Sequence, residues 1–145
     1  MARIKVKLSE DTDELVKALS DKQIFNILVE STPPLEKAMK KNAEKLVRSD
    51  RFGKKRTTGA LAKSIKPTKP RRGGRGANSA YVVVRPTGKD SKGVRNMEKM
   101  VYNEYGTHSH KHIQVPHPIL PKTIAESEDA VADLMQSGLE RELGV

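Results

Sequence analysis

The clearest structural signal in the chain is the segment PLEKAMKKNAEKLV, residues 34–47. Its apolar residues recur at intervals of three and four, from Leu35 to Val47, and most of its charged residues fall between them. This spacing places the apolar side chains on one face of an α-helix and the cations on the other. Pro34 suits a first helical turn, where the N–H that proline lacks is not needed. We therefore predict an amphipathic helix from about residue 34 to 49.

A second amphipathic helix is predicted at the other end of the chain, from about residue 122 to 142. Its apolar residues again follow helical spacing, from Ile124 to Leu139, and its other face is mostly acidic. Three prolines between residues 116 and 121 precede it and restrict the direction from which the chain enters it. Earlier in the chain, Ser20 stands three residues before Gln23, a spacing typical of a helix N-terminus.

Strands are expected in three segments. Residues 3–8 alternate polar with apolar side chains, and residues 80–85 form a β-branched run that ends at Pro86. Residues 98–105 also alternate, which predicts a neighbouring strand and a hairpin with the β-branched run. Together with the helices, these segments predict an α+β fold in which a small, mostly antiparallel sheet packs against the two helices.

The composition sets limits on the class of protein. With 145 residues, the chain is expected to form a single domain, residues 1–145. Only 35% of the residues are hydrophobic and Trp is absent, so the supply of core side chains is small. The absence of Cys excludes disulfides and thiolate chemistry. The sequence contains no apolar run as long as a membrane span and no apolar leader, so we expect a soluble protein that is not exported and has no membrane partner.

The positive charge is concentrated in one part of the chain. Residues 51–75 contain ten Lys and Arg and no acid, and the formal net charge of the whole chain is +10. We predict two flexible basic loops here, at residues 51–58 and 66–79, which contact nucleic acid or another acidic surface. The alternative is a solvated region that keeps the protein soluble. The candidate residues for contact with a partner or DNA are Arg51, Lys54, Lys55, Arg56, Lys69, Arg71, Arg72 and Arg75.

Another segment has the opposite charge, because the charged residues between 126 and 142 are mostly acidic. The chain is therefore electrically bipolar, which suits head-to-tail contact between identical subunits.

Three motifs occur in the order seen in the neck or tail-completion family of long-tailed bacteriophages. TTGALAKSI, at residues 57–65, resembles the TG-x-L-x-x-S-I turn of that family. YNEYGT, at residues 102–107, resembles its Y-x-x-x-E-x-GT strand end, with the acid shifted by about one residue. PHPILPKTI, at residues 116–124, resembles its proline-rich entry into the closing helix, with Ile119 where Phe is commonest. The resemblance covers roughly residues 35–139, and the basic stretch 51–56 replaces the family's proline-containing approach to the first motif.

The resemblance implies a structural virion protein that forms a ring of about six copies in the phage neck. Such a ring would complete the tail and join it to the head, with tail terminator or tail tube proteins and head-completion or connector proteins as partners, and with DNA in its channel. It would be assembled in the host cytoplasm. We expect the motif residues to shape the fold rather than to perform chemistry. They are Thr58, Gly59, Leu61, Ser64, Ile65, Tyr102, Glu104, Gly106, Thr107, Pro118, Leu120 and Pro121.

No arrangement of residues indicates catalysis. His108, His110 and His112 stand at a spacing of two, which on an extended strand would turn three imidazoles to one face, as a metal site needs. We favour a polar interface loop whose contacts change as the histidines titrate. Ser64 and Ser109 lack the sequence context of a nucleophile, and no phosphate-binding loop is present. We therefore expect no enzyme and no cofactor. The alternative function is a small basic nucleic-acid-binding protein that uses the same cations.

Overall fold

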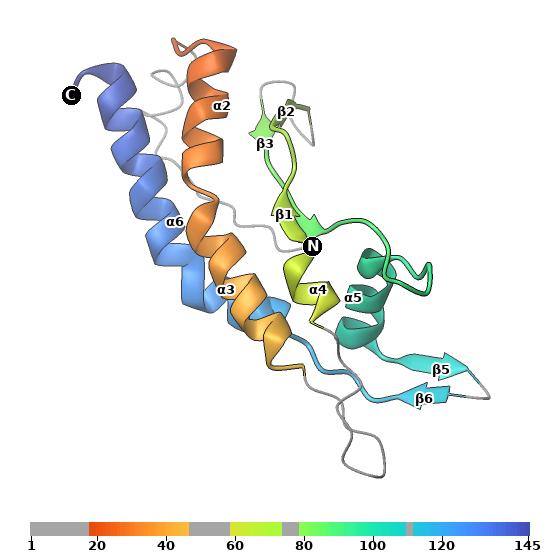
Figure 1. Cartoon of the computed structure of the whole chain (residues 1–145). Helices are drawn as coiled ribbons and strands as arrows, with labels where there is room; N and C mark the ends of the chain where they lie inside the picture. Colours follow the sequence, from red (N-terminus) through yellow and green to blue (C-terminus); the bar gives the residue numbers. More distant parts are fainter. Residues whose placement is uncertain (1–17, 47–58, 74–78, 110–111) are drawn as a thin grey trace.

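The computed structural model describes residues 18–46, 59–73, 79–109 and 112–145. Figure 1 shows the long C-terminal helix α6 (Leu120–Leu143) running alongside α2 (Asp21–Glu30) and α3 (Pro33–Glu44). On the other side of α3 lie α4 (Ala60–Lys63), α5 (Asn96–Tyr105) and the strands. Helix α3 is central, because it contacts α6 as well as α4 and the first strand. These elements confirm the predicted α+β class.

The helices form where the sequence provides apolar spacing and end signals. Ser20 caps α2: its hydroxyl accepts a hydrogen bond from the Gln23 backbone N–H, and the Gln23 side chain accepts one from the Ser20 N–H. Pro33 begins α3, which confirms the predicted helix as far as residue 44. The helix ends there, before residues 45 and 46 of the prediction, and residues 47–49 lie outside the described part. The predicted helix at residues 122–142 is observed as α6, two residues longer at its start.

The described strands are short and pair two by two in antiparallel ladders. They are β1 (Ile65–Pro67) with β4 (Val84–Pro86), β2 (Arg71–Arg72) with β3 (Ala80–Tyr81), and β5 (Thr107–Ser109) with β6 (His112–Gln114). The predicted strand at residues 3–8 lies outside the described residues.

Three predictions about the strand side were wrong. Residues 98–105 form most of helix α5, because the buried residues Asn96, Met100 and Glu104 recur every four positions. The expected hairpin with residues 80–85 is therefore absent, and the β-branched run divides into β3 and β4. Residues 66–79, predicted as loop throughout, contribute strand residues that pair with these two strands.

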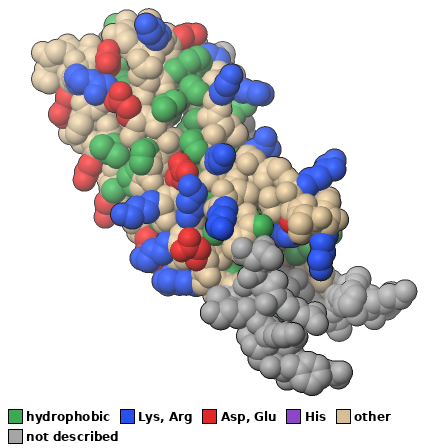
Figure 2. Space-filling view, in the orientation of Figure 1, with side chains coloured by type: hydrophobic (Ala, Val, Ile, Leu, Met, Phe, Trp, Pro, Cys, Tyr) green, Lys and Arg blue, Asp and Glu red, His purple; other side chains and the backbone are tan. Residues whose placement is uncertain are grey.

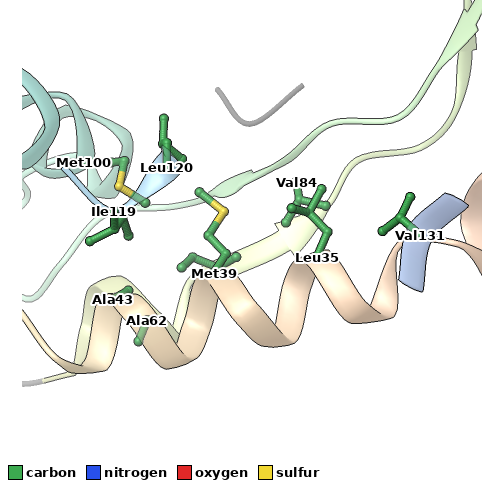
Figure 3. Packing of buried hydrophobic residues seen from close by; sticks show 10 residues of the cluster. Leu35, Met39, Ala43, Ala62, Val84, Met100, Ile119, Leu120 and Val131 are labelled. Atoms are coloured by element: carbon green, nitrogen blue, oxygen red, sulfur yellow. The ribbon is translucent and has the colours of Figure 1, made fainter. Parts of the chain in front are cut away.

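The main hydrophobic core lies between α3, α6 and the strand side (Figure 3). Ile65 and Val84, from the paired strands β1 and β4, are 0% exposed. The other members come from the helices and the approach to α6; they are Leu35, Met39, Ala43, Ala62, Met100, Ile119, Leu120 and Val131. A smaller cluster, Leu19, Ile27 and Leu139, joins α2 to the C-terminal half of α6. Within the described residues, no helix combines the length and the apolar character needed to cross a membrane.

Candidate functional site: two oppositely charged faces

The ladder of β1 and β4 places two cations directly opposite each other. Lys66 pairs with Arg85 across the strands, and both side chains are exposed. The rung before it pairs Ile65 with Pro86, and both of these residues are buried. The alternation of a strand thus turns the apolar side chains inward and this pair outward. We call Lys66 and Arg85 the basic ladder face.

The basic ladder face is electrostatically unfavourable in the isolated chain. Like charges that face each other across two strands repel, with Cβ atoms about 5 Å apart. Neither Lys66 nor Arg85 forms an ion pair with another described residue. An anionic group placed over this rung would remove the repulsion.

The surrounding strand side is also strongly basic. Between residues 59 and 95, the described residues include nine cations and a single acid, Asp90. The Lys99 ammonium and the backbone N–H groups of Val94 and Lys92 hold the pKa of Asp90 below its usual value, and the Lys99 hydrogen bond is the largest cause. The nine cations are Lys63, Lys66, Lys69, Arg71, Arg72, Arg85, Lys89, Lys92 and Arg95.

One of these cations is used to hold the fold together. Arg72 donates from Nε and Nη2 to the Asp21 carboxylate, at 3.0 Å from Nε, and so ties β2 to α2.

The outer face of α6 has the opposite charge. Glu126, Asp129, Asp133 and Glu140 recur at intervals of three, four and seven, so they share the side of the helix away from its buried residues. We call these four residues the acidic stripe. Glu126 accepts a hydrogen bond from the buried Asn42 side chain of α3 at 3.3 Å and lies near Lys41 and Lys122, and Glu140 accepts a hydrogen bond from Gln136.

Two members of the acidic stripe repel each other. Asp129 and Asp133 are exposed, stand one helical turn apart and form no ion pair in the described part of the chain.

The two faces lie on opposite sides of the molecule. In Figure 1, α6 runs along one side of α2 and α3, and the ladder of β1 and β4 lies on the other. Figure 2, in the same orientation, shows most of the Asp and Glu side chains on the α6 side, where Lys and Arg also lie, and mainly Lys and Arg over the strand side. The basic ladder face and the acidic stripe of one chain are thus separated by α3.

The structure describes three of the eight predicted contact residues. Lys69, Arg71 and Arg72 lie on or beside β2 and are exposed. Arg51, Lys54, Lys55, Arg56 and Arg75 lie outside the described residues. Neither Lys66 nor Arg85 was among the predicted contact residues. Lys66 lies within the basic segment but was not singled out, and Arg85 stands alone at the end of a β-branched run, outside that segment.

The motif residue Glu104 forms hydrogen bonds that join α5 to the start of α6. Its carboxylate, on α5, accepts hydrogen bonds from the backbone N–H groups of Ile119 at 2.7 Å and Leu120 at 3.1 Å. It therefore caps the start of α6, where N–H groups have no partner within the helix. Beside it, the carbonyl of Asn103 accepts from the N–H of His117 at 2.6 Å. These contacts close the base of the hairpin formed by β5 and β6.

The first motif also shapes the chain. Gly59 begins α4 with a φ of 70°, a conformation that glycine adopts without strain. The Ser64 hydroxyl donates to the Leu61 carbonyl, and the Ser64 carbonyl accepts from the Thr87 N–H at 2.9 Å.

The remaining motif residues have varied positions. Leu61 and Ile65 pack in or against the main core, Leu120 begins α6, and Gly106 ends α5 with a φ of 73°. Thr107 begins β5, Pro118 and Pro121 are exposed, and Thr58 lies outside the described residues.

The tyrosines of this aromatic-poor chain lie on its surface. Tyr81 and Tyr102 are each 39% exposed and Tyr105 is 70% exposed, and the sequence has no other tyrosine. Tyr102 donates its hydroxyl to Glu98 at 2.6 Å, and this carboxylate raises the pKa of the phenol. Tyrosine is enriched in protein interfaces, so exposed rings in a chain with a small core favour a role in protein contact.

The histidines do not complete a metal site among the described residues. His108 lies in β5 opposite Ile113, His112 lies in β6 opposite Ser109, and His110 is outside the described part. Within that part, no group of three His, Cys, Asp or Glu residues is placed to hold a metal ion. The predicted role of the histidines in a polar interface remains a prediction.

Comparison with known proteins returned no family model, no curated protein and no solved structure that matches this chain.

Proposed function

We propose that this chain is a non-catalytic structural protein of the phage neck, which assembles into a ring that completes the tail and joins it to the head. The ordered motifs TTGALAKSI, YNEYGT and PHPILPKTI support this assignment. The observation that carries it is the separation of the basic ladder face and the acidic stripe onto opposite sides of one subunit. Two complementary faces on opposite sides suit a head-to-tail contact, which closes into a ring when the rotation between copies allows it.

The remaining charges are available to other partners. The cations of the strand side outnumber the acids of the stripe, so a ring would keep basic surface after its subunits meet. That surface suits acidic parts of tail terminator, tail tube, head-completion or connector proteins, or the phosphates of DNA in the channel.

The test is the mass of the assembled protein. The full chain is measured by native mass spectrometry, alone and with each protein encoded beside it in its genome. We expect a closed assembly of defined copy number in at least one of these samples, and neighbouring genes for a portal, capsid or tail tube protein. A chain that stays monomeric in every sample would contradict the proposal.

A nucleic-acid-binding protein is the second candidate, favoured by the like-charged rung of Lys66 and Arg85. It predicts duplex binding that weakens steeply with salt and is lost when both residues become Glu. The matched control changes Lys37 and Lys45, two exposed cations of the α3 region, to Glu. Salt-dependent binding by a strictly monomeric protein, lost in the first variant and kept in the control, would favour this candidate over the ring.

A further inference from the structure

We propose that the acidic stripe on α6 of one copy receives the basic ladder face of the next copy. This inference rests on the proposed ring and assigns the two surfaces that meet within it. Each surface repels itself in the isolated chain, through the Lys66–Arg85 rung on one side and the Asp129–Asp133 pair on the other. Contact between two copies removes both repulsions at once.

The spacing of the charges matches across this contact. Side chains directly opposite in an antiparallel ladder have Cβ atoms about 5 Å apart. Side chains one turn apart on a helix have Cβ atoms about 5–6 Å apart. Lys66 and Arg85 can therefore face Asp129 and Asp133 one to one, with each cation over one carboxylate.

The neighbouring surface adds apolar contact. Leu134, next to Asp133 on α6, is 42% exposed, and Ala130 lies exposed one turn before it. Burial of Leu134 and Ala130 would add apolar contact area beside the charges, as in the core of stable protein interfaces.

A second copy fits both surfaces better than nucleic acid does. A phosphate backbone would neutralise Lys66 and Arg85, but it would leave the repulsion between Asp129 and Asp133 in place and Leu134 uncovered. A second copy uses the basic ladder face, the stripe and Leu134 together, since each subunit carries all of them. The occupant of each face is therefore another copy of this chain.

The experiment uses two charge-reversed variants of the full chain. The first carries Lys66→Glu and Arg85→Glu, and the second carries Asp129→Lys and Asp133→Lys. All four side chains are exposed, so the fold should survive, which circular dichroism checks. In each variant the side chains at positions 66 and 85 have the same charge as those at positions 129 and 133, so we expect each variant alone to be monomeric under conditions in which the wild type assembles.

Mixing the two variants provides the decisive measurement. In an equimolar mixture, every contact pairs opposite charges again, so we expect assemblies in which the variants alternate at a one-to-one ratio by native mass spectrometry. A misfolded variant could not be rescued in this way. The control carries Lys37→Glu and Lys45→Glu and should assemble like the wild type.

The outcomes separate this inference from the proposed function. If the wild type assembles and either charge-reversed variant also assembles alone, the ring stands and this choice of surfaces is overturned. The same holds if the mixture stays monomeric, or if the Lys66 and Arg85 variant loses only duplex binding. If the wild type never assembles, both the ring and this contact are overturned.

Discussion

The two ends of α6 are held in very different ways. Its first half packs into the main core, receives the Glu104 cap from α5 and contacts α3 through Asn42, whose side-chain amide donates to Thr123 Oγ1 at 3.2 Å. Its second half packs on α2 through the small cluster of Leu19, Ile27 and Leu139. The first half is thus fixed by contacts from several elements and the second half mainly by one helix, α2. Such unequal anchoring predicts that the α2 end opens locally while the rest stays folded.

The largest effect should follow from truncating the main core. Ile65 is 0% exposed, and Ile65→Ala should lower the free energy of unfolding by about 3 kcal/mol through lost burial and a cavity. Urea denaturation measures the change. The matched control is Ile27→Ala, at the α2 end. It should lower the free energy of global unfolding by less than Ile65→Ala does. Equal losses at the two positions would show that α6 is held evenly along its length.

Removing the Glu104 cap of α6 should cause the second-largest loss of unfolding free energy. Glu104→Ala leaves the N–H groups of Ile119 and Leu120 without their acceptor and should cost about 2 kcal/mol in unfolding free energy. Glu104→Gln keeps an acceptor oxygen and should recover part of this loss. Thermal unfolding of the three proteins tests the order, and a Gln variant as unstable as the Ala variant would argue against the hydrogen bonds as the cause.

Gly138 offers a smaller and more local test at the α2 end. A Cβ at this position would lie 3.1 Å from two side-chain carbons of Ile27, which opposes the gain of about 1 kcal/mol expected for Ala over Gly in a helix. We expect Gly138→Ala to change the unfolding free energy by less than about 0.5 kcal/mol. In the Ile27→Ala background, the same substitution should stabilise, and a double-mutant cycle measures the difference. If Gly138→Ala had the same effect in both backgrounds, a steric clash with Ile27 would be excluded.

The smallest expected effect is a change of stability with pH that depends on Asp90, away from the α2 end. Asp90 has a lowered pKa in the folded chain, so it stabilises the fold fully above the ordinary aspartate pKa, near 4, and this contribution is lost as the pH falls through the lower folded value. Asp90→Asn should therefore be less stable than the wild type at neutral pH, and the difference should shrink in acid. Melting temperatures recorded across this range provide the check, and a constant difference would contradict it.

The helices were predictable because their signals are local. The segments predicted as helices, residues 34–49 and 122–142, carry apolar residues at helical spacing, and the structure has helices at Pro33–Glu44 and Leu120–Leu143. Helix α5 was mistaken for a strand because its pattern is misleading: Glu104 is buried, whereas Val101 and Tyr105 are exposed. A buried carboxylate that serves a distant helix cannot be recognised from hydrophobic spacing, since the reason for its burial lies elsewhere in the chain.

The candidate site was predictable in its charge but not in its geometry. The bipolar distribution of acids and bases is visible in the sequence, and the acidic stripe follows from helical spacing. The rung of Lys66 and Arg85 could not be predicted. Strand register decides which residues face each other, and the sequence had predicted residues 98–105, not residues 65–67, as the partner strand of the β-branched run.

The closed base of the β5–β6 hairpin makes it a natural place to engineer the protein. The hydrogen bonds from His117 to Asn103 and from Ile119 to Glu104 join the chain just before and just after the hairpin. The rest of the fold is therefore closed without it, and lengthening a loop costs little once its ends are fixed. An affinity tag or fluorescent label inserted between β5 and β6 would mark each copy of the chain at one defined point, so that the copies in any assembly of this chain could be counted and located.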